Sequence, residues 1–528
     1  MLRGGPEQSF KVPPGPAVVT FTGFMESATL TRPRPEDRPA VYKRALDATV
    51  LARVGFALLC IGATVAFFVF PTYPNYDSYY SLLWGREVLD GSPLFFEGFR
   101  VPTQHPLAIA VGAGLSLLGD GADRLWIAII FASFIALVWG LYRLGRVAFT
   151  PLVGLIAAAL LVTRFDFAFL AARGYIDVPY MALVVWSAAL EAERGRRGTP
   201  VFILLALAGL LRPEAWLLAG LYFLWMALRG SWRQRLWYAA LAAIGPVTWC
   251  AVDLAVTGDP LFSLLYTSGS AEELGRQRTL SEIPIAIPYF LASLVKPPVF
   301  LGALAGLLIA VFLTPRRMVV PFVLLGCGLG TFVLIGLAGL SVIERYLIVA
   351  ALGLLIFAAV TLGGFTMIAR GTRLRMAWQV GAVVVVVLGV AYTGARVNLG
   401  RFESELRFRG KAHQALEQAL RAPEVRQGLR CGPLTLPNHK LVPDARWIAG
   451  LGADEAFARA DVGRPGATRP DNGRGAQVDT GVAIYVTGRF ALFKHAFTDK
   501  ADSPLIEVPR PGWERVAVTP YYAAYVRC

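Results

Sequence analysis

The stretch LARVGFALLCIGATVAFFVF, residues 51–70, is apolar apart from Arg53 and Thr64. A helix of roughly 20 residues spans the hydrocarbon core of a bilayer, about 30 Å, so this stretch predicts a membrane-crossing helix. It runs directly into PTYPNYDSYY, residues 71–80, where a single carboxylate, Asp77, stands among tyrosines. The first stretch therefore indicates a membrane protein. The second raises the question of why an acid lies where the chain leaves the membrane.

The whole chain has a membrane-protein composition. It has 528 residues, of which 55% are hydrophobic and only 16% charged, and its mean hydropathy is +0.54. A soluble domain carries roughly 25% charged residues. Apolar runs recur from Leu51 almost to Val397, which predicts a polytopic α-helical membrane protein.

The net charge of +15 is concentrated in short turns between the apolar runs. These turns contain Arg143 and Arg146; Arg194, Arg196 and Arg197; Arg229, Arg233 and Arg235; Arg316 and Arg317; and Arg370, Arg373 and Arg375. An excess of arginine in short loops marks the cytoplasmic side. Because no basic folded domain accompanies these turns, the charge argues against nucleic-acid binding.

The basic turns predict a topology of about 11 transmembrane helices. The expected crossings are 51–70, 124–142, 150–163, 178–190, 201–211, 215–228, 236–256, 299–313, 319–340, 347–368 and 377–395. Residues 1–49 then form a disordered cytoplasmic tail, residues 50–396 the transmembrane domain with its first outer loop at 71–123, and residues 397–528 an extracytoplasmic domain. This scheme requires that HPLAIAVGAGLSLLG, residues 105–119, lies at the outer surface without crossing, and at about 15 residues it is short for a span.

The same topology collects charged residues on the outer side. They are Asp77 and His105 in the first loop, Arg173 and Asp177 in the second, Arg212 and Glu214 at a third turn, Lys296 at the end of a long fourth loop, and Glu344 and Arg345 at the mouth of a late helix. Any one pair reads equally well as a local salt bridge or as snorkelling side chains at a helix end. Charges beside hydrocarbon are costly, however, and the convergence of the set on one face favours a functional site.

The order of these motifs resembles that of the GT-C membrane glycosyltransferases, in particular the polyprenyl-phosphate-sugar enzymes akin to protein O-mannosyltransferases and lipid A aminoarabinose transferase. The matching pieces are NYDSYY (75–80), TQHPLAIAVGAGLSLLG (103–119), ARGYIDVPYMAL (172–183), LLRPEAW (210–216) and ERYLIV (344–349). The resemblance covers roughly residues 50–396.

The resemblance implies a role for the opening acid. In this family a carboxylate of the first outer loop is the general base that takes a proton from the acceptor hydroxyl, and Asp77 matches it. An anionic phosphate leaves without being protonated, so one carboxylate suffices for inversion, unlike the paired acids of glycoside hydrolases.

The resemblance also implies cations for the lipid phosphate, with Arg345 first and Lys296, Arg212 and Arg173 after it. Orienting or sugar-binding roles would fall to Asp177, Glu214, Glu344, His105, Tyr76 and Tyr80. The tyrosines, with Tyr79 and Trp84, could instead form an aromatic belt at the membrane interface.

Two departures from the family limit what carries over. Ser78 follows Asp77 where protein mannosyltransferases have a second acid, which puts a protein acceptor in doubt. The paired acids that hold a divalent metal in oligosaccharyltransferases are missing, so no obligatory metal or other cofactor is expected. His105, a lone histidine before a proline, is more typical of a hydrogen-bonding loop residue than of a metal ligand.

After Val397 the composition becomes polar. RFESELRFRGKAHQALEQALRAPEV (401–425) has helical periodicity, and GVAIYVTG (481–488) and ERVAVTPYYAAYVRC (514–528) are typical of short strands. A small α/β domain is therefore expected outside the membrane. Of the five cysteines, Cys431 and Cys528 lie there, and whether they pair is left open by the sequence.

We therefore expect a multi-pass cell-membrane glycosyltransferase that moves a sugar from a polyprenyl-phosphate donor, with inversion, to a hydroxyl of a cell-envelope glycan, lipid or protein. The alternatives are a transporter or lipid flippase, and a non-catalytic scaffold that binds through its outer domain. Transporters often show internal repeats and interrupted helices near mid-membrane. No convincing repeat is visible in this sequence.

Overall fold

The computed structural model describes residues 38–70, 72–98, 100–273, 281–396, 399–459, 477–487 and 509–528. Contacts divide the chain into two units, residues 1–47 and residues 48–528, and the second unit contains the helix bundle and the sheet. The predicted cytoplasmic tail falls mostly on residues 1–37, which lie outside the described residues.

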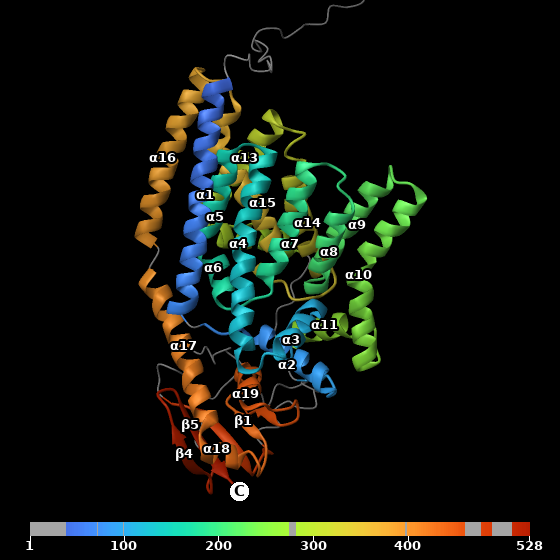
Figure 1. Cartoon of the computed structure of the whole chain (residues 1–528), viewed down its shortest axis with the longest axis vertical. Coiled ribbons are helices and arrows are strands. Elements are labelled where there is room, and N and C mark those ends of the chain that lie inside the picture. The colour runs from blue at the N-terminus through green and yellow to red at the C-terminus, as the bar shows by residue number, and fades with distance from the viewer. Residues whose placement is uncertain are drawn as a thin grey trace, which may run out of the picture. The chain divides into compact units, whose positions relative to one another are not determined.

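Each predicted crossing coincides with a helix in the described part of the chain (Figure 1). These helices are α1 (Arg38–Val69), α4 (Ala122–Ala148), α5 (Pro151–Val162), α7 (Asp177–Glu193), α8 (Thr199–Leu211), α9 (Glu214–Ala227), α10 (Trp232–Thr257), α13 (Pro297–Leu313), α14 (Val319–Leu337), α15 (Ile348–Gly363) and α16 (Arg373–Arg396). By length and composition, 6 spans among the described residues are long and apolar enough to cross a membrane, or 8 when each of two bent helix pairs counts as one. The protein is a multi-pass membrane protein, and the number of 11 crossings stays a prediction.

The helices differ in what surrounds them. Nearly all of α15 is buried, since 89% of its most apolar stretch lies inside the protein. The buried share of the corresponding stretch is only 6% in α1 and 11% in α16. A helix that is apolar on every side is stable either in a protein core or in the hydrocarbon of a bilayer. Helix α15 is thus the centre of the bundle, and α1 and α16 present their apolar side chains to lipid.

The first outer loop is largely helical. Helix α2 (Tyr76–Asp90) begins after Asn75, whose side chain accepts a hydrogen bond from the amide of Ser78. Asp77 lies in the first turn, where a negative charge suits the helix dipole. Helix α3 (Pro106–Ser116) packs so closely on α2 that a Cβ built on Gly85 would lie 2.2 Å from the amide nitrogen of Ala113. This close contact holds Asp77 in place relative to α3.

Besides α2, helices that the sequence analysis did not anticipate lie in the fourth and second predicted loops. The long fourth loop contains α11 (Phe262–Glu273) and α12 (Ile283–Val295), and α12 meets α13 at an angle of 109°. The bend falls at Lys296, whose φ of 72° is unusual for a residue with a side chain. The second loop contains α6 (Phe165–Ala172), bent 63° from α5. Short 3-10 turns complete the bundle at Gly119–Gly121 (η2), Glu344–Leu347 (η3) and Gly364–Met367 (η4).

The polar region after residue 397 is the small α/β domain that the sequence predicts. Its elements are α17 (Leu399–Arg421), α18 (Pro423–Gly428), β1 (Leu434–Leu436), η5 (His439–Leu441), α19 (Val442–Ala449), β2 (Ala456–Ala458), β3 (Gly481–Val486), β4 (Glu514–Val518) and β5 (Tyr522–Arg527). The strand order is β2-β1-β3-β5-β4, with β1 parallel to β2 and β3, and β5 antiparallel to β3 and β4. The sheet and its helices enclose a hydrophobic core separate from that of the bundle.

The α/β domain is fastened to the outer loop by buried polar contacts. Arg446 of α19 forms an ion pair with Glu87 of α2, with 2.5 Å between Nη2 and Oε1 and both side chains almost fully buried. His413 of α17 stacks on Tyr73, with 4.5 Å between ring centroids. Because breaking a buried ion pair is costly, we infer that the domain stays docked over α2, and therefore over Asp77.

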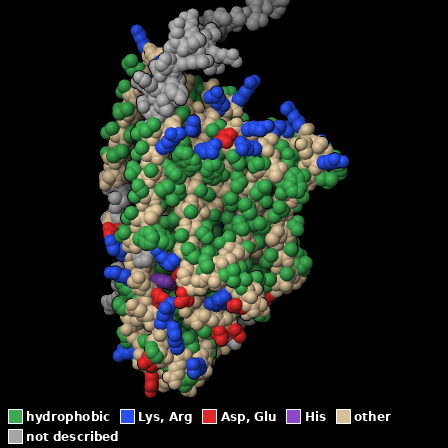
Figure 2. All heavy atoms as spheres, viewed as in Figure 1, with side chains coloured by type: hydrophobic (Ala, Val, Ile, Leu, Met, Phe, Trp, Pro, Cys, Tyr) green, Lys and Arg blue, Asp and Glu red, His purple; other side chains and the backbone are tan. Residues whose placement is uncertain are grey.

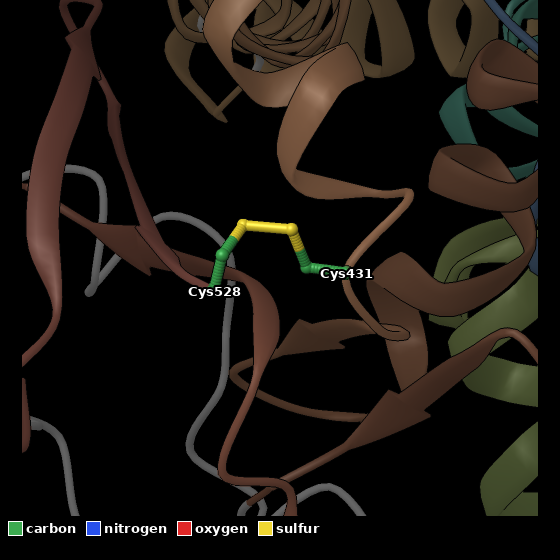
Figure 3. Close-up of a disulfide and its surroundings, with 2 residues drawn as sticks. All are labelled: Cys431 and Cys528. Atoms are coloured by element: carbon green, nitrogen blue, oxygen red, sulfur yellow. A yellow bond between two sulfur atoms is a disulfide. The ribbon is translucent and has the colours of Figure 1, made fainter.

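Cys431 and Cys528 form a disulfide between the end of α18 and the last residue of the chain (Figure 3). Their sequence separation is 97 residues, and closing a loop of about 100 residues restricts the unfolded chain by about 4.7 kcal/mol in the chain-entropy account. Structural disulfides persist in oxidising compartments, and the extracytoplasmic placement of this domain stays a prediction.

We expect the Cys431→Ser/Cys528→Ser variant to lower the free energy of unfolding of the α/β domain by about 4 kcal/mol. Hydrogen exchange of the β3 and β5 amides would measure this. Cys60→Ser, at a half-buried thiol of α1, is the matched control. Equal protection of the two strands in the parent and the double variant would show that the disulfide contributes nothing to stability.

Lys and Arg side chains gather along the end of the bundle opposite the α/β domain (Figure 2). The basic turns therefore share one end of the bundle, and the side of the membrane that this end faces stays a prediction. We expect a cysteine introduced at the exposed Ser92 to react with an impermeant thiol reagent added to intact cells, and one at the exposed Gly195 to remain unlabelled. Labelling at Gly195 would contradict the sidedness.

Candidate active site

The centre of the candidate site is Arg345, in the 3-10 turn that leads into α15. Its Nε lies 2.8 and 2.9 Å from the two carboxylate oxygens of Asp177, its Nη2 lies 2.6 Å from Oδ2 of Asp177, and its Nη1 lies 3.0 Å from Oδ2 of Asp77. Asp177 is the first residue of α7, and Asp77 is in the first turn of α2. One guanidinium thus ties together three elements that are far apart in the sequence.

A second arginine extends this network. Arg212 follows the last residue of α8 and donates to Asp177 and to Glu214, with 2.6 Å between its Nη2 and Oε1 of Glu214. Arg212 has the extended backbone that a residue before proline favours, and its Nε lies 2.9 Å from Oε1 of Glu214 on the other side of Pro213. The structure therefore brings together five of the residues that the sequence singled out.

The charges of the network do not cancel. Asp77, Asp177 and Glu214 carry three negative charges and Arg212 and Arg345 two positive ones, which leaves minus one. Asp177 and Arg212 are fully or almost fully buried, whereas the side chains of Asp77 and Arg345 are 21% and 25% exposed. The buried members form a fixed support, and the exposed pair can meet a ligand.

Asp77 has the open geometry that a base needs. Arg345 holds its Oδ2, and no donor among the described residues reaches its Oδ1. A general base must lie within hydrogen-bond reach of the proton that it takes. The free oxygen and the partial exposure make Asp77 the carboxylate of this network best placed to do so.

His105 lies next to these charges as a neutral group. Burial lowers the pKa of its imidazole to about 4, and the nearby Arg212 and Arg345 act in the same direction against the attraction of Asp77. Its Nδ1 is buried and has no partner among the described residues. A neutral imidazole can accept or donate a hydrogen bond, but it cannot supply positive charge to a phosphate.

Two predicted cations lie outside the network. Lys296 pairs with Asp166, with 3.1 Å between Nζ and Oδ2. Arg173 lies against the rings of Phe169 and Tyr175, at 5.6 and 5.8 Å from their centroids. The ring of Tyr175 also lies 5.1 Å from the guanidinium carbon of Arg345, so this tyrosine stands between the two arginines.

Three residues with predicted orienting or sugar-binding roles lie beside the network. Glu344 is exposed, and the guanidinium of Arg345 contacts Asp77 and Asp177. Tyr80 is only 4% exposed and packs edge-on against Tyr76. The hydroxyl of Tyr76 donates to the backbone oxygen of Arg100 at 2.8 Å.

The sequence reasoning missed aromatic residues that flank the arginines. Tyr180 and Tyr346 lie 5.7 and 5.3 Å from the guanidinium carbon of Arg212. Tyr346 directly follows Arg345 and Tyr175 comes two residues before Asp177, so their place beside the charged residues was a usable signal. Among the described residues, no three His, Cys, Asp or Glu side chains form a group suited to a metal ion.

These features define a membrane protein with a charged site at the end of its helix bundle that meets the α/β domain. No known family matches the sequence, and no curated protein matches it. Among solved structures, ArnT from Cupriavidus metallidurans in its apo state is similar, with a TM-score of 0.51 and 15% identity over 90% of this chain and 98% of that one.

Two structures of the Archaeoglobus fulgidus oligosaccharyltransferase are also similar. One is tethered to an acceptor peptide with an NVT sequon and one is in the apo form; their TM-scores are 0.46 and 0.47 and their identities 11% and 12%. The matches cover 86% and 85% of this chain and 70% and 72% of the others. The likeness to ArnT over almost the full length of both chains gives this protein the GT-C fold that its motifs resemble.

Proposed function

We propose that the protein is a membrane glycosyltransferase that moves a sugar from a polyprenyl-phosphate donor to an extracytoplasmic acceptor hydroxyl, with inversion at the anomeric carbon. The observation that carries this proposal is the contact between Asp77 and Arg345, a partly exposed acid paired with a partly exposed cation. The pair lies at the end of the bundle over which the α/β domain docks. The pair places a base next to a cation that can bind the donor phosphate, as the transfer requires.

In the proposed reaction, Oδ1 of Asp77 takes the proton from the acceptor hydroxyl as its oxygen attacks the anomeric carbon. The bond between that carbon and the phosphate oxygen breaks on the opposite face, and the lipid phosphate leaves with the bonding electron pair. The phosphate gains one negative charge as it leaves. A guanidinium beside it therefore stabilises the transition state more than the ground state. Arg345 supplies this guanidinium.

The surrounding residues act on Arg345. Asp177 contacts it through both carboxylate oxygens, which fixes the plane of the guanidinium fork. Arg212 and Glu214 hold Asp177 in turn. We assign these three residues a positioning role, and His105 a hydrogen bond to a sugar or acceptor hydroxyl.

Arg345 remains the first ligand for the donor phosphate. Arg212 is committed to two carboxylates, Lys296 is paired with Asp166, and Arg173 makes no contact with the network. These three cations are therefore secondary. The proposal includes no obligatory metal, because Arg345 occupies the position between Asp77 and Asp177 where a cation would bridge them.

The transporter alternative receives less support from the same contacts. A transporter needs its polar site near the middle of the membrane, where both sides can reach it in turn. Here the charged residues lie at helix ends, at the start of α7, after α8 and before α15.

The proposal is tested by incubating the purified full-length protein with a panel of polyprenyl-phosphate sugars, with and without a chelator. We expect release of polyprenyl phosphate with at least one sugar, unchanged by the chelator. No release from any donor, together with sugar- or lipid-dependent flux in proteoliposomes, would favour the transporter.

A further inference from the structure

Helix α1 contacts α4 through two aromatic pairs, Phe56 with Trp139 and Phe67 with Phe131, but leaves open space beside its small residues. Its inner side has small residues, among them Ala52, Gly55, Gly62 and Ala66. Small residues usually let neighbouring helices approach closely. A Cβ built on Gly55 or Gly62 would nevertheless meet no atom within 4 Å. The small residues therefore leave space free for something other than a helix.

The space is a groove of about 670 Å³ between α1 and the helices α4, α5, α6 and α17. Figure 1 shows α1 running beside α5 and α6 at the outside of the bundle. The groove follows α1 from Ala52 to Phe70, a rise of about 27 Å at 1.5 Å per residue. Its walls are almost entirely apolar, and its long, narrow form suits a hydrocarbon chain.

Arginines stand around the outer mouth of the groove, whose lining also contains one carboxylate, Glu403, paired with Arg407. Thr72, Thr163 and Ala172 line this end, and each is close to an arginine. Arg124 donates to the backbone oxygen of Thr72 at 2.7 Å, Arg164 lies 3.4 Å from Oγ1 of Thr163, and Arg173 follows Ala172 in the sequence.

Among the described residues, the guanidinium groups of these three arginines form no ion pair with a carboxylate, although the backbone amide of Arg124 donates to Oδ1 of Asp123 at 2.6 Å. Arg124 and Arg164 bind backbone oxygens, and Arg173 lies against aromatic rings. In addition, Thr72 is 4% exposed and its Oγ1 has no partner in the described chain. A hydrogen-bond acceptor with negative charge would satisfy both the arginines and the threonine.

We propose that this groove binds one acyl chain of an anionic phospholipid from the surrounding bilayer, with the headgroup phosphate at Arg124, Arg164 and Arg173. Its lining includes none of the residues of the Asp77–Arg345 network, although Arg173 and Arg345 both lie against the ring of Tyr175. The bound lipid fills the space between α1 and the bundle and thereby stabilises the position of α1. This proposal does not depend on the proposed transferase activity.

The test uses the purified full-length protein in a non-ionic detergent and compares phosphatidylglycerol, phosphatidylcholine and polyprenyl phosphate by native mass spectrometry and thermal unfolding. We expect phosphatidylglycerol to bind about tenfold or more tightly than phosphatidylcholine and to raise the unfolding temperature. Equal binding of the two phospholipids would overturn the proposal. Displacement of phosphatidylglycerol from the groove by equimolar polyprenyl phosphate would overturn it in favour of the donor lipid.

Two variants test separately how the groove and its mouth contribute to lipid binding. Gly62→Leu fills the groove and should lower phosphatidylglycerol binding about tenfold, while Gly220→Leu, on α9 and also without atoms within 4 Å of its Cβ position, should leave it unchanged. Arg173→Gln should reduce the preference for phosphatidylglycerol over phosphatidylcholine and retain binding of the chain. Unchanged lipid binding in both Gly62→Leu and Arg173→Gln would refute the site.

Discussion

Replacing Asp77 by asparagine should lower turnover by about 100-fold or more, while donor binding and membrane insertion stay close to those of the parent. Asparagine has nearly the same size as aspartate and its side-chain oxygen can still accept the bond from Nη1 of Arg345. The amide cannot take up a proton at neutral pH, so the variant removes the base and little else. The readout is the rate of polyprenyl phosphate release under saturating donor.

The matched control is Asp90→Asn at the exposed end of the same helix, α2. This change removes an acid from the same outer segment at a position outside the network. We expect turnover within about twofold of the parent. Should Asp77→Asn also stay within a few-fold of the parent, Asp77 is not the base.

Replacing Arg345 by alanine should weaken donor binding and also slow the transfer by about 100-fold. The guanidinium contacts a phosphate that is charged in the ground state and gains further charge as the bond breaks. Both KM and kcat should therefore change. Arg345→Lys should recover only part of the loss, because one ammonium lacks the forked geometry.

The alanine variant also removes a partner from Asp177, which is fully buried and would keep only Arg212. Loss of one partner of a buried ion pair costs about 3–5 kcal/mol, so thermal unfolding must be measured alongside activity. Arg345→Lys retains a positive charge and controls for this effect. Glu344→Gln, at the exposed neighbour of Arg345, should change neither binding nor rate. Parent-like donor binding and turnover in a folded Arg345→Ala variant would assign Arg345 a structural role.

Local patterns in the sequence predicted most of the helices because each apolar run is long enough to be recognised alone. The strands β3, β4 and β5 also followed from alternation and β-branched residues. The strands β1 and β2 have only 3 residues each, which is too short for a pattern. Helix α11 was missed because FSLLYTSGSAEE mixes polar and apolar residues. Helix α12 was missed because it has only 13 residues and contains Pro284 and Pro288, so it is too short to be recognised as a span.

The site was predictable in part. Asp77, Asp177, Arg212 and Arg345 were singled out because charges beside hydrocarbon are costly and because the predicted topology put them on one face. Their pairing was not predictable, because Arg345 and Asp77 are 268 residues apart and only the packing of α2, α7 and α15 brings them together. For the same reason the sequence placed Lys296 with the phosphate ligands, whereas in the fold it pairs with Asp166.

The central claim is that Asp77 drives the single displacement of a lipid phosphate from a sugar. The most direct measurement gives the parent and the Asp77→Asn variant the same isotopically labelled polyprenyl-phosphate sugar together with an envelope fraction, and determines the anomeric configuration of the labelled product by NMR. We predict a labelled product of inverted configuration with the parent and about 100-fold less of it with Asp77→Asn. A product of retained configuration, or equal amounts from the two proteins, would contradict the account.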